Sequence, residues 1–397
     1  MPRPLVALFA CACGLSVANV YYAQPLLDAL GADFGLDHAA VGGVITATQI
    51  GCALALVLLV PLGDRIDRRP LMLWQAGALV AALIAVAAAG SAPALLAGML
   101  AVGLLGTAMT QGLIAYAATA GASTERGRVV GAAQGGVVIG LLLARVLAGL
   151  IADVAGWRGV YLFSAAVMLG LSLILWRRLP QQAPATTRLS YPQLILSMLT
   201  LLRHERVLQI RGVIAMLMFA AFSVFWSALV LPLSAPPYGL SHTAIGAFGL
   251  VGVVGALAAA RAGQLTDRGM GQWVTGGALL LLLASWLPLW WFDSGLGLHP
   301  LWWLVIGIVA LDLGGQAIHV ANQSMIFAAP SDAHSRLVGC YMLFYSVGSG
   351  LGAIASTWAY ATAGWPAVCL LGAAISACAL AFWSLTLRRM PKELARR

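Results

Sequence analysis

Two charged residues lie inside long apolar stretches, where a charge is costly to place. Arg145 lies about two-thirds of the way through residues 127–152, and Asp312 lies near the middle of residues 301–327. An unpaired guanidinium at such a depth costs on the order of 3 kcal/mol or more, so Arg145 should have an acidic partner. Asp312 is the acid at a comparable depth. The pair, or Asp312 alone, could bind a proton or a charged substrate group; a fixed structural ion pair is the alternative.

Two further side chains could extend this chemistry along the same stretch. His319 follows Asp312 by seven residues, about two helical turns, so a titratable imidazole could lengthen a proton relay. A hydrogen-bonded packing histidine is the alternative interpretation. Gln316 lies between them and corresponds, through an internal repeat, to Gln111. Two amides at equivalent positions favour a binding site more strongly than either alone.

The first and seventh apolar stretches carry polar and aromatic groups that predict a cavity. The candidates in the first stretch are Asn19, Tyr21, Tyr22 and Gln24, grouped just before Pro25. A lipid-facing helix rarely holds so many hydrogen-bonding groups, so at least one face should be buried or wet. Phe222 and Trp226 in the seventh stretch could supply an aromatic surface, although such side chains are more often packing or interface residues.

The elements that must position these residues are membrane helices. Of 397 residues, 61% are hydrophobic and only 9% are charged, and the mean hydropathy is +0.93, whereas a soluble domain carries roughly a quarter charged residues. Apolar stretches long enough to span a hydrocarbon core of roughly 30 Å recur along the chain. We expect an all-α polytopic membrane protein with twelve spans, near residues 5–30, 38–62, 71–89, 93–120, 127–152, 159–177, 208–233, 242–262, 273–292, 301–327, 336–361 and 366–386.

The second half of the chain repeats the first. GDRIDRRP at Gly63–Pro70 is echoed by GQLTDRG at Gly263–Gly269. A repeat of about 200 residues in an apolar chain predicts two pseudo-symmetric six-helix bundles, with a substrate path where such bundles meet. We expect bundles at residues 1–178 and 208–397, the second ending in a short cytoplasmic tail, joined by a cytoplasmic connector at 179–207. The later part of the connector is either an interfacial helix or an early start of the seventh span.

Arginine placement predicts the orientation. Nearly every arginine lies at the N-terminus, in alternate loops, in the connector or in the tail, which places both termini in the cytoplasm by the positive-inside rule. The net charge of +9 follows from this asymmetry and indicates contact with anionic lipid, not with nucleic acid. We expect a monomer in the cytoplasmic membrane of a bacterium or archaeon.

The loop at Gly63–Pro70 resembles the helix 2–3 loop signature of the major facilitator superfamily, and the resemblance covers the whole chain. It implies the superfamily's fold of twelve helices in two bundles and a latch that seals the cytoplasmic side. Simple topology-setting charge is the alternative. The implied gate residues are Asp64, Arg65, Arg68 and Glu125 in the first half, and Gly263, Asp267 and Arg268 in the second.

The fifth span resembles the helix 5 signature of the superfamily's antiporters. Gly131, Gly140 and Gly149 provide small residues for close helix packing, while Arg145 stands where a proline is usual. Ala108 stands where the helix 4 signature has an arginine. The resemblance points to the drug/proton-antiporter branch, similar to arabinose-efflux permeases.

Other chemistry lacks a signature in this sequence. A phosphate-binding Gly-Lys loop, a nucleophile–base–acid set and a metal-ligand cluster are all missing, so we expect neither an enzyme nor a cofactor. The expected function is proton-coupled efflux of a small organic molecule, drug-like, sugar-like or amino-acid-like, by alternating access. A symporter importing a sugar or organic anion is one alternative. A receptor or scaffold that does not transport is another.

Overall fold

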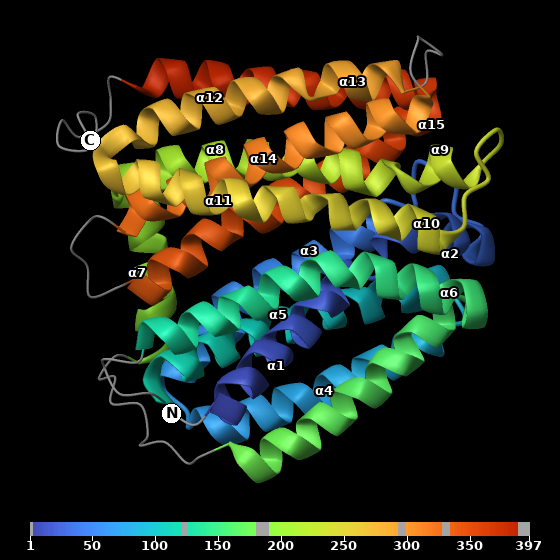
Figure 1. The fold of residues 1–397 in the computed structure, drawn as a ribbon. Coiled ribbons are helices and arrows are strands. Elements are labelled where there is room, and N and C mark those ends of the chain that lie inside the picture. The colour runs from blue at the N-terminus through green and yellow to red at the C-terminus, as the bar shows by residue number, and fades with distance from the viewer. Residues whose placement is uncertain (1–2, 121–125, 180–189, 293–298, 328–333, 388–397) are drawn as a thin grey trace. The chain divides into compact units, whose positions relative to one another are not determined.

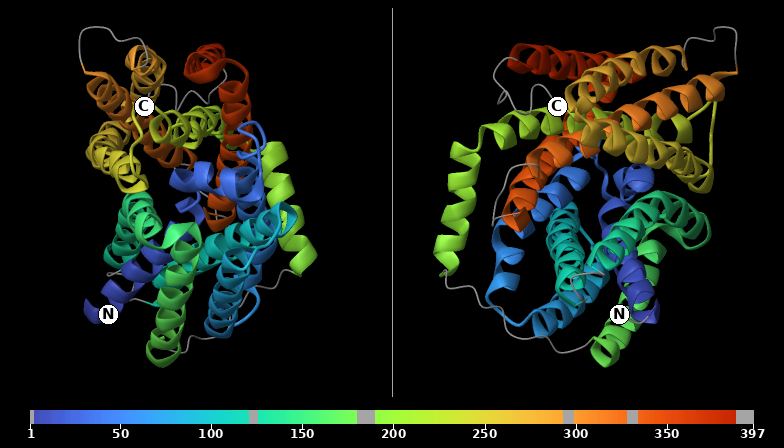
Figure 2. Two further views of the ribbon diagram at one scale, coloured as in Figure 1. Left: turned by 90° about the vertical axis from the view of Figure 1, so that its right-hand side faces the viewer. Right: turned by 60° about the vertical axis from the view of Figure 1, so that its left-hand side comes forward.

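The computed structural model describes residues 3–120, 126–179, 190–292, 299–327 and 334–387. Within these ranges the chain is helical and contains no strand, as Figure 1 and the two views of Figure 2 show. Nine helical segments in this part of the chain are long and apolar enough to cross a membrane. Three of the nine are 50 or 51 residues long, enough for two crossings each.

Each of the three long segments is broken near its middle. The helix α6 (Arg126–Arg178) breaks at Gly156, where φ is +69°, and turns back on itself in Figure 1. The helix α15 (His334–Thr386) breaks at Ala363–Gly364, and the segment His242–Trp291 breaks at Gly269 with φ of +86°. A positive φ strains any residue with a Cβ, so glycine is the expected residue at each turn. Counting each broken segment as two crossings gives the twelve predicted spans.

The chain divides into two compact units, each described separately below. Unit 1 comprises Met1–Leu36, Gly43–Ser197 and Leu240–Gly246, and unit 2 comprises Asp37–Gly42, Met198–Gly239 and Ala247–Arg397. The principal helices of unit 1, besides α6, are α1 (Arg3–Tyr21), α2 (Leu27–Phe34), α3 (Gly43–Leu54), α4 (Arg68–Ala87) and α5 (Ala92–Ala120). Those of unit 2, besides α15, are α8 (Arg206–Ala228), α9 (Val230–Ser234), α11 (Val253–Leu265), α12 (Gly271–Ala284), α13 (Trp286–Trp291) and α14 (Pro300–Phe327).

Shorter elements complete the spans. They are 3-10 turns at Gln24–Leu26, Pro61–Asp64 and Phe248–Gly252, π turns at Ala55–Leu59 and Thr266–Met270, and the helix α10 (His242–Ala247). The first span therefore reaches Phe34, past its predicted end, after a break around Pro25. Proline lacks the N–H that would continue the helical ladder, which accounts for the break. The second span begins at Gly43, five residues later than predicted.

The connector contains a helix of its own, α7 (Tyr191–His204). Glu205 is extended, with φ of −84° and ψ of 94°, and α8 starts immediately after it at Arg206. The segment is thus a separate helix and not an early start of the seventh span. On α7, Leu194 and Met198 are buried, while Leu196 and Leu199 are exposed.

Candidate functional site

Arg145 is held within unit 1 by Tyr21, the last residue of α1, and by Gln24 in the turn that follows. Its side chain is 3% exposed, and Nε donates a hydrogen bond of 2.9 Å to Gln24 Oε1. Its guanidinium also lies 5.6 Å from the centre of the Tyr21 ring, within the range of a cation–π contact. The structure therefore brings together three of the residues predicted from sequence. Asp312, the predicted acidic partner, belongs to unit 2, and the ion pair stays a prediction.

Asn19 and Tyr22 face the interior of unit 1 instead of joining Arg145. Asn19 is fully buried; its Nδ2 donates to the Leu15 carbonyl at 2.8 Å, and its Oδ1 accepts from Ser164 Oγ at 2.6 Å. Tyr22 is also buried and is hydrogen-bonded to Ser164. These polar groups satisfy one another across two helices, which fixes the first span against the second arm of α6.

Asp312 and Gln316 lie on one face of α14 in unit 2. A Cβ placed on Gly255 of α11 would lie 3.2 Å from Asp312 Cβ and 3.0 Å from Gln316 Cγ. Asp312 is 3% exposed, and Gln316 is half-buried. A carboxyl group buried inside a membrane-spanning helix is costly to ionise and is a candidate proton carrier for that reason. Gln111, the amide at the equivalent position, is half-buried in unit 1.

His319 contacts aromatic groups from two neighbouring helices. Its Nδ1 lies 3.0 Å from the Tyr341 hydroxyl, and its ring meets the Phe219 ring edge-on at 5.3 Å between centroids. Asp312 is two turns away on the same helix, as the spacing predicts. Elsewhere in unit 2, the Phe222 and Trp226 rings lie 6.3 Å apart, and Phe222 also faces Gly315. Trp226 is buried, whereas Phe222 is half-buried.

Sequence reasoning missed Arg211, which is fully buried near the start of α8. Its Nη1 donates to Thr275 Oγ1 at 2.9 Å and to Asn322 Oδ1 at 3.4 Å, while Nε has no hydrogen-bond partner among the described residues. Both partners are neutral, so unit 2 holds a fixed positive charge in its core. Arg211 is the fourth residue of the predicted seventh span, where a long side chain can still reach the lipid headgroups, so only the tertiary structure reveals its burial.

The loop after the second span is organised around Arg68. Its Nη2 forms an ion pair with Asp64 Oδ1 at 3.1 Å, its Nη1 donates to the Ala115 carbonyl on α5, and its Nε donates to the Gly63 carbonyl. Asp67 caps α4 by accepting from the Arg69 backbone N–H at 3.1 Å. Arg65 is exposed. The predicted partner Glu125 lies outside the described residues.

The second copy of this loop is more open. Asp267 and Arg268 are exposed in the π turn, and neither forms a hydrogen bond or ion pair with another described residue. Gly263 is half-buried, and a Cβ placed on it would lie 3.5 Å from Val320. In the first copy Asp64 and Arg68 pair with each other, whereas in the second copy Asp267 and Arg268 are exposed. A role for either loop as a gate stays a prediction.

The glycines of the fifth span differ in what they contact. A Cβ on Gly140 would lie 2.2 Å from the Gly14 carbonyl oxygen of α1, and one on Gly149 would lie 2.1 Å from the His242 carbonyl oxygen. Both positions require glycine for backbone contact. Gly131 has no neighbour within 4 Å of such a Cβ, whereas a Cβ on Gly136, which the motif did not include, would lie 2.0 Å from the Ala10 carbonyl oxygen.

A metal centre finds no support in this geometry. Across the described ranges, no group of three or more His, Cys, Asp or Glu side chains could hold a metal ion. What the site residues offer is a buried carboxyl group, two buried guanidiniums and several amides. These groups can bind solutes and protons.

Comparison with known proteins decides the family. The sequence model of the Major Facilitator Superfamily matches residues 7–297 and 238–397. The chain belongs to the Major Facilitator Superfamily. A member of that superfamily is a membrane transporter and not an enzyme, in agreement with the expectation from sequence.

Individual relatives agree with this assignment. The chain is 40% identical over 379 residues to YgaY, described as an uncharacterized transporter of Escherichia coli strain K12, and the match covers 96% of this chain and 94% of YgaY. It is 31% identical over 382 residues to a protein of Streptomyces coelicolor described as a transporter, covering 94% of this chain and 84% of that protein.

Solved structures support the fold. One is a bacterial homologue of the human lysosomal transporter Spinster in an inward-facing, occupied conformation, with a TM-score of 0.76 and 15% identity, covering 100% of this chain and 99% of that one. Another is an auto-inhibited POT family peptide transporter, with a TM-score of 0.78 and 13% identity, covering 100% of both chains. At such low identity the similarity establishes the twelve-helix fold alone.

Proposed function

We propose that this superfamily member is a proton-coupled exporter of a small organic molecule, of the drug/proton-antiporter type. The observation that carries the proposal is Asp312, a carboxyl group 3% exposed within a membrane-spanning helix. Such a group changes its charge at large energetic cost, so its proton occupancy can drive a conformational preference. Protonation of Asp312 from one side of the membrane and release to the other then supplies the energy for alternating access.

The neighbouring residues take supporting roles in this proposal. Gln316 lies beside Asp312 and can orient a solute by hydrogen bonding, while His319 and the Tyr341 hydroxyl lie within hydrogen-bonding distance and can extend the proton path. In unit 1, Arg145 and Gln24 present donors and acceptors from α6 and the end of the first span. Phe222 and Trp226 would line the apolar part of the solute site.

The decisive experiment replaces Asp312 with Asn. A thermal-shift screen of drug-like, sugar-like and amino-acid-like compounds on the purified protein first identifies a solute. We expect D312N in proteoliposomes to lose transport driven by an imposed pH gradient, while exchange of labelled for unlabelled solute continues. The matched control is Glu205→Gln, because Glu205 is an exposed acid outside the spans. Undiminished gradient-driven transport by D312N would refute the assignment.

Import of an organic anion is the second candidate, and Arg211 favours it. A buried guanidinium with only neutral partners in the described part of the chain makes unit 2 attractive to anions. The two candidates differ in direction: with an acidic vesicle interior, an antiporter accumulates solute inside and a symporter releases it. A receptor or scaffold would move no solute. In such a protein, cysteine crosslinks between residue 64 and α15 would trap only a single conformation.

We further infer that the protein lies in a bacterial inner membrane with both termini in the cytoplasm and acts as a monomer. The arginine-rich alternate loops support this orientation, and the Escherichia coli relative supports the compartment. Protease protection of a C-terminal tag in right-side-out vesicles, against its cleavage in inverted vesicles, tests the orientation.

A further inference from the structure

A short sequence occurs twice in the chain, each time where a span begins. GLDHAAVG at residues 35–42 returns as GLSHTAIG at residues 239–246. We call Asp37–Gly42 the first repeat segment and Leu240–Gly246 the second repeat segment. The second segment lies in the later half of the sequence but belongs to unit 1, and the first lies in the earlier half but belongs to unit 2. Each segment is therefore docked on a unit that is mostly built from the other half of the chain.

The second repeat segment is anchored in unit 1 by two carboxylates. His242 Nε2 lies 3.1 Å from Asp28 Oδ1 of α2, and His242 Nδ1 lies 3.3 Å from Asp153 Oδ1 of α6. Asp153 also accepts the backbone N–H groups of His242 at 3.0 Å and of Thr243 at 2.9 Å. These side chains are only 21% to 26% exposed. Three elements therefore meet at one imidazole.

The geometry of the imidazole favours its protonated form. A neutral imidazole has one N–H donor and one acceptor nitrogen, whereas imidazolium donates from both nitrogens. Here both nitrogens face carboxylate oxygens, which only accept hydrogen bonds. Loss of the proton would leave a nitrogen lone pair facing a carboxylate and would leave two negative charges uncompensated. Proton binding at His242 and docking of the segment therefore stabilise each other.

We propose that His242, Asp28 and Asp153 form a proton-binding site that holds the second repeat segment on unit 1 while the proton is bound and releases it when the proton leaves. The inference rests on the proposed function, because alternating access requires helix contacts that form in one state and break in another. The segment continues at Ala247 into unit 2, so its release frees the start of the eighth span. The site lies on the face predicted to be extracellular.

The direction of the pH dependence follows from the charges. Asp28 from α2 and Asp153 from α6 are the charged groups that face His242. Arg145, whose backbone lies beside Gly246 of the segment, donates to Gln24, and Arg158, on the same helix as Asp153, pairs with Asp33. Docking is thus strongest in mildly acidic solution, where the imidazolium is fully populated, and weakens as the pH rises and the proton is lost.

Hydrogen–deuterium exchange tests the proposal without a solute. The full chain in lipid nanodiscs is followed by mass spectrometry at pH 5.5 to 8.5, and each rate is divided by the intrinsic rate at that pH. We expect protection of residues 240–246 to fall by about fivefold or more across this range, the scale of a typical coupling between two sites. In His242→Gln we expect the protection to be low and independent of pH. A flat wild-type profile, or an unchanged slope in H242Q, overturns the proposal.

The repeat supplies a matched control. His38 occupies the same place in the first repeat segment, but its ring meets the Tyr360 ring edge-on at 5.8 Å. His38→Gln should leave the pH slope of residues 240–246 unchanged, and a lost slope in H38Q overturns the proposal. Asp28→Asn provides a second variant should H242Q fail to fold. A neutral amide can accept or donate opposite Nε2, so we expect D28N to reduce the slope, and an unreduced slope counts against the site.

This test separates the site from the proposed function. A flat exchange profile together with loss of coupling in D312N would remove the His242 site and leave the proton-coupled transporter standing. A pH-dependent profile that H242Q abolishes, together with normal coupling in D312N, would support the His242 site and refute the assignment of Asp312 as the coupling residue.

Discussion

The two repeat segments pack in the same way but are held by different chemistry. A Cβ on Gly246 would lie 2.3 Å from the Arg145 carbonyl oxygen of α6, and one on Gly42 would lie 2.6 Å from the Ala353 carbonyl oxygen of α15. Arg145 and Ala353 each follow a glycine of the repeat, Gly140 or Gly348, by five residues. Gly246 and Gly42 therefore bring their segments into backbone contact with equivalent positions on α6 and α15.

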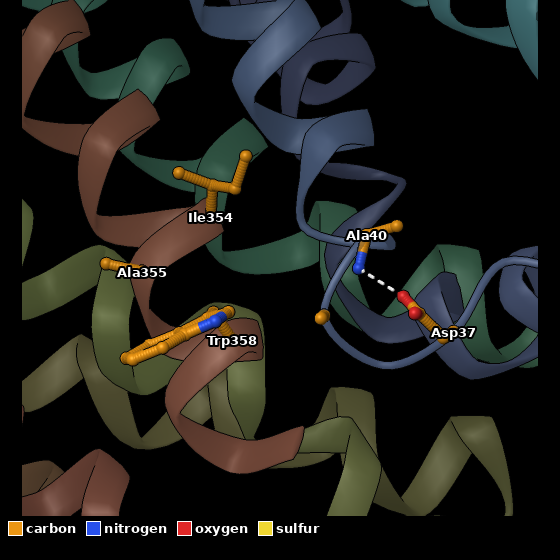
Figure 3. Close-up of a pocket in the computed structure, with 6 residues that line it drawn as sticks. Asp37, Ala40, Ile354, Ala355 and Trp358 are labelled. Atoms are coloured by element: carbon orange, nitrogen blue, oxygen red, sulfur yellow. Dashed lines mark hydrogen bonds between the residues drawn. The ribbon is translucent and has the colours of Figure 1, made fainter. Parts of the chain in front are cut away.

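Both segments also start with the same kind of turn. Asp37 Oδ1 accepts the Ala40 backbone N–H at 2.7 Å, and Ser241 Oγ accepts the Ala244 backbone N–H at 3.3 Å. Figure 3 shows the first of these bonds, where Asp37 and Ala40 border a cavity of about 440 Å³ together with Ile354, Ala355 and Trp358. Close packing and local turns are therefore common to the two copies.

The difference lies in charge. Asp28 and Asp153, which hold the second repeat segment, correspond through the repeat to Pro232 and Ala361. The first segment is held instead by Thr357 Oγ1, which donates to the Ala39 carbonyl at 3.3 Å, and by the contact of His38 with Tyr360. The two repeat segments share one docking geometry, but the second is held by charged side chains and the first by a hydroxyl group and an aromatic contact. We infer that only the ionic copy responds to pH.

Blocking the close packing should have the largest effect on docking. In Gly246→Leu the new side chain would meet the α6 backbone, and overpacking of this kind costs about 1–3 kcal/mol. We expect hydrogen exchange of residues 240–246 to accelerate by about 5- to 150-fold while residues 37–42 are unchanged. Gly42→Leu should produce the reciprocal result. Gly131→Leu is the control, since Gly131 is exposed with no neighbour within 4 Å.

Removing the carboxylate should have an intermediate effect. Asp153→Ala deletes the acceptor of two backbone N–H groups and one partner of His242. Loss of a cap costs about 1–2 kcal/mol, so exchange of residues 242–243 should accelerate by roughly 5- to 30-fold. Asp37→Ala in the other segment removes a single exposed bond and should change its segment less. Equal effects would mean that the extra carboxylate contributes nothing.

Removing the threonine hydroxyl should have the smallest effect. The Thr357 hydroxyl already has acceptors on its own helix, at the Ala353 and Ile354 carbonyls. Thr357→Val should therefore cost about 0.5 kcal/mol or less, and exchange of residues 37–42 should rise by no more than about twofold. An increase of tenfold or more would show that the neutral copy is also held mainly by a directed contact.

Long apolar runs made the twelve spans predictable, because the hydrocarbon thickness fixes how many such residues a helix needs. Helical periodicity also placed Gln316 and His319 on the same face of the predicted helix as Asp312. The His242 site was not predicted, since Asp153 and Asp28 are separated from His242 by 89 and 214 residues and meet only through tertiary packing. The repeated Gly-Leu-X-His sequence was the available signal.

Asn19 and Tyr22 illustrate a further limit of the sequence. Hydrophobicity shows that polar groups in a membrane helix must avoid lipid, but it does not distinguish a solute cavity from the interior of a bundle. In the structure Ser164 partners both residues. Tyr21 and Gln24, on the same stretch, meet Arg145 instead. The two pairs are offset by two residues, about 200° around a helix, so packing residues and candidate site residues lie on roughly opposite sides of this stretch.

The burial of Arg211 has a consequence for biogenesis. Its partners Thr275 and Asn322 are synthesised 64 and 111 residues later, so α8 emerges from the ribosome carrying a guanidinium whose acceptors do not yet exist. At roughly 5–20 residues per second that interval lasts on the order of ten seconds. Arg211 lies near the start of α8, where its long side chain can reach the lipid headgroups during the wait. The second bundle therefore closes around this charge only after the tenth span of the chain, which carries Asn322, has been made.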